Sequence, residues 1–368
     1  MLSSWVSRRN GGVFEAVVAQ AKMVQALEGE PVVLGVRDEA SEADGYRLDG
    51  IETHLVDQSG PASLVFAPQL GDVLAKARLD LLHLHGIWQY PTHAAGVWAN
   101  DTGKPLVISP HGMLDPWITQ RKAWKKHLAR FGWERKGWRR AAAFHALTDA
   151  EGADIATEAP GARIAMIPNP APPLSSMDDY PRGPNGLYLG RIHEKKNIAA
   201  LIAGWIAARP DLPEDATLTI AGWGDDEGIA MLEQAMKGQT DGSVEFVGTA
   251  FGAQKAALFD LSRFLVLPSL SEGLPMAILE AWAAGVPTIQ SEECHLPEGP
   301  GNGAALLCGT DSASIRDALV EGLTMTDDAW LTMAKAAQEL AGGPFSAVTV
   351  SREWAQLYGA LIEGGAGS

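Results

Sequence analysis

Short runs of apolar residues alternate along the chain with longer segments in which apolar positions recur at helical spacing. In the first half the runs predict strands, at Met1–Val6, Pro31–Val36, Leu79–His85, Pro105–Ser109, Ala141–Leu147 and Ala162–Ile167. The segments between them predict helices, over Val13–Glu28, Ser63–Leu79 and Thr92–Asn100. Strands that alternate with helices are typical of a parallel sheet covered on both faces. The pattern therefore predicts an α/β fold of the doubly wound, Rossmann-like type.

The same alternation resumes after a proline-rich segment. Residues 169–184 hold five prolines in sixteen positions, so we expect a linker at 171–184 between domains 1–170 and 185–344. Further strands are predicted at Gly186–Leu189, Thr217–Ala221, Val244–Val247, Phe264–Leu267, Thr288–Gln290 and Ala304–Leu307. An amphipathic helix is expected over Phe345–Ile362, so residues 345–368 form a terminal helix and a glycine-rich tail.

Composition is that of a globular protein with an ordinary core. The 368 residues, 46% of them hydrophobic, suit about two domains. The two cysteines, Cys294 and Cys308, form no disulfide framework, and their spacing from His295 fits no zinc site. The first residues lack the apolar core of a secretory signal, and no run approaches the roughly 18 apolar residues of a membrane span. We therefore expect a cytoplasmic protein.

Charge is unevenly distributed. The net charge of −16 argues against general nucleic-acid binding, yet Arg121–Arg140 holds nine Lys/Arg and one acid. Trp117, Trp124, Phe131 and Trp138 recur there every seven residues, which places them on one helix stripe. This stripe packs on the N-terminal sheet in one interpretation. In the other, the segment contacts an anionic membrane peripherally, at its cytoplasmic face.

The most informative stretch is Ser269–Pro287. A strand leads into a Ser/Gly/Pro turn, and a helix is predicted to begin at Pro275 and to end at Gly285. Backbone N–H groups at the start of such a helix lack intrahelical partners and favour an anion. The same stretch carries two carboxylates, Glu272 and Glu280, which suit hydroxyl groups. A nucleotide sugar combines phosphates with hydroxyls and fits both features.

Cations follow another predicted strand. Arg191 and Lys196 come directly after it, where ligands of open α/β sheets bind, so they could meet a diphosphate; a solvated basic loop is the alternative. The Gly222-Trp-Gly224 sequence is interpreted as a plain turn. Asp-x-Asp occurs nowhere, so we expect cations and a helix dipole, not a metal ion, to neutralise a leaving diphosphate.

Histidines lie at predicted strand ends in the first half. His83 and His85 end one strand, and His111 follows the next in a Ser-Pro-His-Gly loop. A histidine at a strand end is more often structural than catalytic, but His111 precedes Gly112 and is the best placed for a ligand.

These motifs resemble those of the retaining family 4 glycosyltransferases with the GT-B fold. Glu272 and Glu280 match the family's E-x7-E signature, and Gly190, Arg191 and Lys196 match its G-R-x4-K element. The Gly222-x-Gly224 turn and the Val244–Gly248 stretch follow in the family's order. In the first half, the glycine pair at Gly12, the His83-x-His85-Gly stretch and Ser109–Trp117 are similar to members that act in surface-polysaccharide assembly.

The resemblance implies two Rossmann-like domains facing a cleft, with a C-terminal helix that crosses back to the N-domain. It implies a hexosyltransferase-type enzyme that needs no cofactor or metal. The donor would be a nucleotide sugar and the acceptor a glycan or lipid-linked saccharide. The diphosphate would lie at Arg191, Lys196 and Gly12. The donor sugar and ribose would lie at Glu272, Gly273, Leu274 and Glu280, with His111 near the reacting carbon.

Two alternatives stay open. A sugar-nucleotide epimerase or hydrolase of the same fold would release nucleotide or invert C2 without an acceptor. A non-catalytic scaffold of that fold would do neither, but it does not explain why the matching residues are all present.

Overall fold

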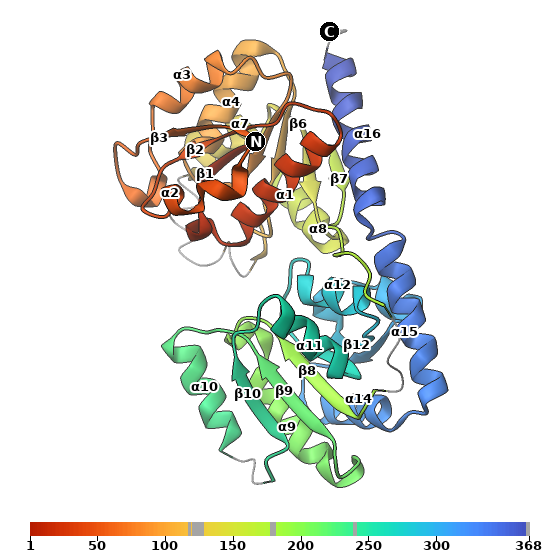
Figure 1. The fold of residues 1–368 in the computed structure, drawn as a ribbon. Helices are drawn as coiled ribbons and strands as arrows, with labels where there is room; N and C mark the ends of the chain where they lie inside the picture. The colour runs from red at the N-terminus through yellow and green to blue at the C-terminus, as the bar shows by residue number, and fades with distance from the viewer. Residues whose placement is uncertain (117–118, 120–128, 177–181, 238–240, 366–368) are drawn as a thin grey trace. The chain divides into compact units, whose positions relative to one another are not determined.

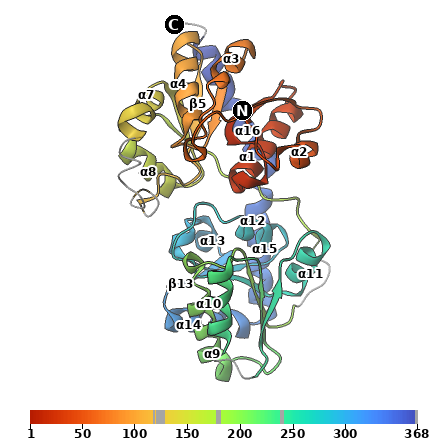
Figure 2. The same cartoon turned by 90° about the vertical axis from the view of Figure 1, so that its left-hand side faces the viewer.

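The computed structural model describes residues 1–116, 119, 129–176, 182–237 and 241–365. The chain forms two compact units (Figures 1 and 2). Unit 1 comprises residues 1–167 together with 351–368, and unit 2 comprises residues 168–350. Each unit is a parallel sheet covered by helices, which confirms the predicted doubly wound α/β architecture.

Within the described residues, the sheet of unit 1 has seven strands in the order β3-β2-β1-β4-β5-β6-β7. The strands are β1 Leu2–Trp5, β2 Val32–Val36, β3 Glu52–Val56, β4 Leu82–His85, β5 Leu106–Ser109, β6 Ala141–Ala146 and β7 Ile164–Met166. The helices are α1 Gly12–Ala26, α2 Ser41–Asp44, α3 Gln69–Lys76, α4 Tyr90–Thr102, α7 Arg135–Trp138 and α8 Asp149–Glu158. Sequence order reverses between β1 and β4, where a doubly wound sheet opens for a ligand.

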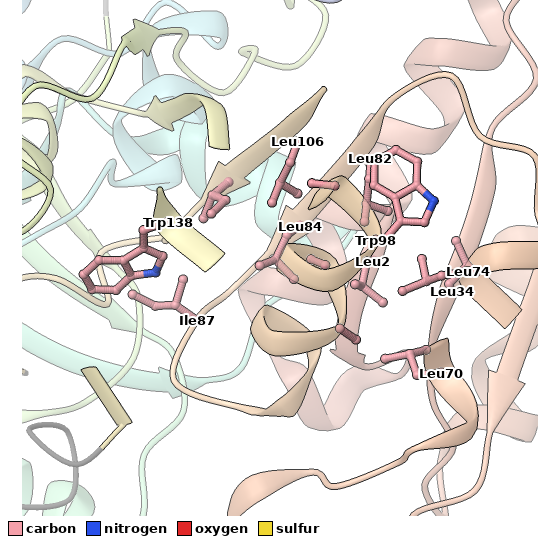
Figure 3. Close-up of a cluster of buried hydrophobic side chains, with 14 of the residues drawn as sticks. Leu2, Leu34, Leu70, Leu74, Leu82, Leu84, Ile87, Trp98, Leu106 and Trp138 are labelled. Atoms are coloured by element: carbon pink, nitrogen blue, oxygen red, sulfur yellow. The ribbon is translucent and has the colours of Figure 1, made fainter. Parts of the chain in front are cut away.

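Two hydrophobic clusters hold unit 1 together. The larger joins the sheet to α3 and α4 and includes Leu2, Leu84 and Trp98 (Figure 3). The smaller packs α1 on the sheet through Phe14 and Val17. The sheet is therefore covered on both faces, so the loops at the strand ends are where a ligand can reach it.

The sheet of unit 2 has six described strands in the order β10-β9-β8-β11-β12-β13. They are β8 Asn185–Leu189, β9 Thr217–Ala221, β10 Val244–Gly248, β11 Phe264–Leu267, β12 Thr288–Ser291 and β13 Ala305–Cys308. The helices are α9 Ile198–Ala208, α10 Asp226–Met236, α11 Ala253–Leu261, α12 Met276–Ala283, α13 Glu298–Gly301, α14 Ser312–Thr324 and α15 Asp327–Gly342. Here the order reverses between β8 and β11.

The last helix, α16, runs over Ala347–Gly365, and its residues from Ser351 onward belong to unit 1. At the other boundary, the Ala171 amide donates to the Phe345 carbonyl at 2.7 Å. The Ser175 amide likewise donates to Ala283 at 2.9 Å. The first part of the proline-rich segment thus lies against unit 2.

Three local predictions differ from the structure. Strand β3 was not predicted, because Val56 is its only buried side chain and the apolar run is short. The helix predicted over Ser63–Leu79 is limited to Gln69–Lys76, because Pro68 occupies its N-cap. Pro275 likewise stands at the N-cap of α12 instead of inside it. The predicted end of that helix at Gly285, whose φ is +66°, is confirmed.

Candidate active site

The reversal point of unit 2 brings together the two loops that carry the predicted ligand residues. β8 and β11 are adjacent and parallel, so the loops that follow them leave the same edge of the sheet. The Leu270 amide donates to the Lys195 carbonyl at 2.7 Å, and the Asn197 side-chain amide donates to Pro268 at 3.0 Å. These bonds fix the loop of Arg191–Lys196 against the loop of Glu272.

Lys196 and Glu272 meet directly at this edge. The Lys196 ammonium lies 2.5 Å from Glu272 Oε1, and the Ser269 hydroxyl donates to the same oxygen at 2.6 Å. The side chains are only 22% and 9% exposed, so water screens this pair weakly. The two residues were expected to serve different parts of one ligand. The structure adds that, in this state, each is the other's counter-ion.

Buried groups surround this pair. The Tyr188 hydroxyl donates to the Arg191 carbonyl at 2.7 Å, and burial with the nearby Glu272 charge raises the pKa of Tyr188. Burial, followed by Glu272, raises the pKa of the Cys294 thiol to about 12. Both groups therefore stay protonated at neutral pH and add no charge beneath the ion pair.

The start of α12 lies beside Glu272. Among the described residues, the N–H groups of Gly273, Leu274 and Met276 have no hydrogen-bond acceptor. A Cβ built on Gly273 would meet no atom within 4 Å, so its backbone is open to approach. This arrangement offers backbone donors to an oxygen-rich ligand.

Glu280, on the next turn of α12, is also paired. Its Oε1 lies 2.7 Å from the ammonium of Lys255, which projects from α11. Sequence reasoning did not identify Lys255. No local motif could have done so, because the residue lies 25 positions upstream in an ordinary helix.

Arg191 is the most accessible cation of the set. Its guanidinium lies 3.2 Å from Asp225, and both side chains are more than half exposed. The Gly228 amide donates to Asp225 at 3.0 Å, which lowers the pKa of that carboxyl; Arg191 contributes less. An exposed pair of this kind is weak, so Arg191 can exchange its partner for a ligand.

The Gly222-Trp-Gly224 turn supports the Arg191 loop. A Cβ on Gly222 would lie 1.8 Å from the Gly190 carbonyl oxygen. The Ile192 amide donates to the Trp223 carbonyl at 2.6 Å. The turn therefore needs glycine for close backbone contact and shapes the loop that presents Arg191.

At the reversal point of unit 1, the glycine pair opens α1. Gly11 has a φ of +56° and Gly12 is the first helical residue. A Cβ on Gly12 would meet no atom within 4 Å. The start of α1 is therefore open, as a phosphate contact at Gly12 would require.

Three neighbouring strands of unit 1 carry a hydrogen-bonded chain whose direction can be assigned. The Ile167 carbonyl, which only accepts, lies 2.7 Å from His145 Nε2, so this nitrogen carries the proton. His145 Nδ1 then accepts from the Ser109 hydroxyl at 2.7 Å. The Ser109 oxygen in turn accepts from His83 Nε2 at 2.6 Å.

Helices α1 and α16 complete this chain. His83 Nδ1 is left as an acceptor, and the Tyr358 hydroxyl of α16 donates to it at 2.7 Å. The Tyr358 oxygen accepts from the Gln20 amide of α1 at 2.8 Å. Burial lowers the pKa of both His83 and His145, the latter to about 4. The chain is thus a neutral, satisfied network, which is the structural role expected for His83.

His111 lies beside this network in a constrained loop. Its φ is +55°, and the following Gly112 amide donates to buried Glu151 at 2.6 Å. The second Glu151 oxygen accepts from the Leu147 amide at 2.9 Å. His85 Nδ1 lies 3.1 Å from His111 Nε2. Burial lowers the pKa of His111 to about 3, so the ring is neutral at physiological pH.

Only part of the basic segment can be described. Trp117, Trp124 and residues 121–128 lie outside the described residues. Trp138 is 5% exposed and belongs to the core of unit 1, as the packing interpretation expects at that position. Buried Glu134 precedes it, and burial raises the pKa of its carboxyl to about 8.

Among the described cations of this segment, Arg130 is only 18% exposed and pairs with Glu158, whereas those that follow it are exposed and border two cavities. Lys136, Arg139 and Arg140 are exposed, and Arg139 lines both cavities, of about 490 and 560 Å³. Among the described residues, no helix combines the length and apolarity that a membrane span requires.

Comparison with known proteins assigns both halves of the chain to glycosyltransferase models. Residues 183–325 match the model described as "Glycosyl transferases group 1", and residues 11–170 match the "Glycosyl transferase 4-like domain". The chain is 27% identical over 150 residues to the Escherichia coli "O-antigen chain mannosyltransferase B". That match covers 41% of this chain and 39% of that protein, so the chain spans less than half the length of the curated relatives it matches first.

Longer matches extend over most of the chain. A "GDP-mannose:cellobiosyl-diphosphopolyprenol alpha-mannosyltransferase" of Xanthomonas oryzae is 27% identical over 298 residues, which cover 77% of this chain and 75% of that protein. Among solved structures, Anabaena Alr3699/HepE in complex with UDP superimposes with a TM-score of 0.77. It covers 98% of this chain and 99% of that one at 17% identity, which supports a shared fold.

Proposed function

Because the chain belongs to the group 1 glycosyltransferases and has their GT-B fold, we propose that it transfers a hexose from a nucleotide-diphosphate sugar to a glycan or lipid-linked acceptor. The observation that carries this proposal is the partly buried Lys196–Glu272 pair beside the open start of α12. A cation, a carboxylate and free backbone donors at one sheet edge match a ligand that has both phosphates and hydroxyls.

In this proposal the donor separates the paired charges. Its diphosphate takes Lys196 and Arg191, and the start of α1 at Gly12 contributes a further contact. Glu272, released from Lys196, accepts hydrogen bonds from the sugar hydroxyls. The amides of Gly273 and Leu274 donate to the same sugar. Before the donor binds, the charges of Lys196 and Glu272 neutralise each other. The donor then replaces this ion pair by its own contacts with each of the two side chains.

In this proposal Glu280 binds the ribose as Glu272 binds the sugar, through hydrogen bonds to its carboxylate. Its carboxylate accepts hydrogen bonds from the ribose hydroxyls, while the ion pair with Lys255 holds the carboxylate in position. His111 donates to the donor sugar near the reacting carbon. Since His111 is neutral, it is suited to donate a hydrogen bond and does not bring a positive charge to the leaving group.

We further propose that transfer retains the anomeric configuration and proceeds without a metal ion. The leaving diphosphate, held by Lys196 and Arg191, would accept the acceptor's proton as the new bond forms on the same face. The assay is NMR analysis of the product formed in excess EDTA. An inverted product, or activity restored only by a divalent cation, would refute the respective part.

The donor is tested first, because binding needs no acceptor. Calorimetric titration with GDP-mannose, UDP-glucose and ADP-glucose should identify one ligand that binds more tightly than the other two. GDP-mannose is the first choice, since several relatives are mannosyltransferases. Absence of binding by all three would count against this set of donors. Nucleotide release or C2 inversion without acceptor would favour the hydrolase or epimerase alternative.

A second proposed contact is with an anionic membrane surface, at its cytoplasmic face, through the basic segment. The exposed Lys136, Arg139 and Arg140 support it by charge complementarity. Co-sedimentation with phosphatidylserine-containing vesicles should decrease in an Arg139→Glu/Arg140→Glu variant but not in the control Lys22→Glu. Equal binding to neutral vesicles, or none to either, would exclude this contact.

A further inference from the structure

His85 has no role in the proposed function, yet it makes an unusual contact. It ends β4, is 2% exposed, and its Nδ1 lies 3.1 Å from Nε2 of His111. The two ring planes are nearly parallel, 16° apart, with centroids 5.3 Å apart. Its other nitrogen, Nε2, is buried and has no partner among the described residues. A buried polar group that bonds only to one neighbour suggests a role through that neighbour.

The unpartnered nitrogen indicates the direction of this hydrogen bond. If His111 were the donor, neutral His85 would carry its own proton on Nε2, as a buried N–H without an acceptor. If His85 is the donor, its buried Nε2 is an unfilled acceptor instead. Buried N–H groups without acceptors are the rarer of these two defects. The His85 Nδ1–H therefore donates to His111 Nε2.

The direction of the bond fixes the tautomer of His111. Since Nε2 accepts, the proton of the neutral ring must lie on Nδ1. His111 Nδ1 has no hydrogen bond among the described residues and is not among the buried unpartnered atoms, so solvent can reach it. The loop is held in place by the bond between the Gly112 amide and Glu151 and keeps His111 at a φ of +55°.

We propose that His85 is a positioning residue that fixes His111 as the Nδ1–H tautomer, so that His111 presents a hydrogen-bond donor to an oxygen of the sugar or phosphate. The proposal deepens the function proposed above and rests on it for the identity of the ligand. It assigns His111 the role of a neutral donor, and it excludes a general base at that nitrogen.

The test combines His85→Phe with a reading of the tautomer itself. Phenylalanine keeps a ring against His83, whose ring centroid lies 4.1 Å from that of His85, and removes the buried unpartnered nitrogen. Long-range ¹H–¹⁵N NMR, with the His111 signal assigned through His111→Gln, should find the Nδ1–H form in the wild type. It should find a larger share of Nε2–H in His85→Phe. A predominantly Nε2–H ring in the wild type would overturn the proposal, whether or not the protein transfers sugar.

Kinetics then separate positioning from a merely structural role. His85→Phe should lower kcat by roughly tenfold, as expected when one hydrogen bond made in the transition state is lost, with little change in donor Kd or Tm. The loss should disappear when His85→Phe is combined with His111→Gln, because both act through one group. His85→Asn, which offers an N–H near Nδ1, should restore part of the rate, and His93→Phe is the matched control.

The outcomes distinguish this proposal from the one on which it rests. If His111→Gln lowers turnover but His85→Phe changes neither turnover nor tautomer, His85 is structural and the inference fails. If the tautomer shifts as expected but no donor binds the wild type, the proposed function fails while the hydrogen bond stands. An equal loss from His85→Phe in the presence and absence of His111 would also overturn positioning.

Discussion

Both units carry their candidate residues near the point where the strand order of a parallel sheet reverses. These residues are charged in unit 2 and neutral in unit 1. In unit 2, the loops after β8, β9 and β11 carry charged pairs, Lys196 with Glu272 and Arg191 with Asp225. In unit 1, β4, β5 and β6 carry neutral, buried histidines and a serine hydroxyl that are joined in a directed hydrogen-bonded chain. A doubly wound sheet specifies where a ligand binds, while the loop residues specify which chemistry it meets.

This difference suggests that the two units have different roles in the proposed function. Charged pairs can open to receive a diphosphate because a ligand replaces each lost contact with an equivalent one. A neutral network has no charge to exchange and is suited to hold groups in fixed tautomers and positions. The four predictions below test this contrast, in order of decreasing effect.

The largest effect is expected from the central ion pair. Lys196→Ala or Glu272→Ala should lower transfer by at least roughly 100-fold, because each removes a contact to the donor and leaves a partly buried charge unpaired. The double change Lys196→Met/Glu272→Gln should recover thermal stability but not transfer. Steady-state kinetics and thermal unfolding of all three variants provide the measurement, and near-normal turnover in both single variants would defeat the site assignment.

The next effect concerns the backbone that shapes the charged site. Gly222→Ala should destabilise the protein by about 3 kcal/mol or more, since its methyl group would lie 1.8 Å from the Gly190 oxygen. Gly273→Ala is the matched variant, because the same methyl would meet nothing within 4 Å. It should fold normally and bind donor about tenfold more weakly if the ligand approaches that N–H closely. Equal stability of the two variants, measured by denaturant unfolding, would contradict the geometry.

Acid should affect unit 1 before unit 2. His145 has a folded-state pKa of about 4, below its ordinary 6.5, so the unfolded chain binds a proton first as the pH falls. Stability is therefore lost between about pH 6.5 and 4, and His145 alone accounts for about 2 kcal/mol at pH 5. Buried His83, His85 and His111 act in the same direction, whereas Glu134, whose pKa burial raises to about 8, acts in the opposite direction and offsets only part of this loss. Hydrogen exchange corrected for intrinsic rates should show that β4–β6 lose protection at pH 5 while β8–β12 keep theirs; simultaneous loss would argue against this assignment.

The smallest effect is expected at Tyr358 of α16, where the hydrogen-bonded chain of unit 1 meets this helix. Tyr358→Phe removes the donor to His83 Nδ1 and leaves that buried nitrogen unfilled. The free energy of unfolding should fall by about 1–2 kcal/mol, with donor binding unchanged. Tyr46→Phe is the control, since Tyr46 is 67% exposed and its hydroxyl should contribute little. An equal, negligible effect of both changes would show that the chain contributes no stability.

The architecture was predictable because it depends on local patterns. All six described strands of unit 2 were located from their apolar runs, which are most complete in the central strands β8, β11 and β12, where nearly every residue is buried. β3 was missed because an edge strand with one buried residue gives no such run. The helix over Ser63–Leu79 was too long because periodicity was followed across Pro68, which instead caps a shorter helix.

The candidate residues could be named from sequence, but their pairings could not. Residues that follow strands are recognisable, so Arg191, Lys196 and Glu272 stood out. That Lys196 pairs with Glu272 depends on how two loops 76 residues apart in sequence direct their side chains. The bond between His85 and His111, which are 26 positions apart in sequence, is of the same kind. Such contacts depend on the assembled sheet, and no local pattern encodes them.

The central claim is that a nucleotide sugar binds at the edge of unit 2 where Lys196 meets Glu272. Backbone hydrogen exchange with and without GDP-mannose, UDP-glucose or ADP-glucose tests it most directly. We predict that one donor slows exchange at residues 190–197 and 269–280, and that Lys196→Ala abolishes this protection. Protection confined to other segments of unit 2, or binding that survives Lys196→Ala unchanged, would contradict the claim.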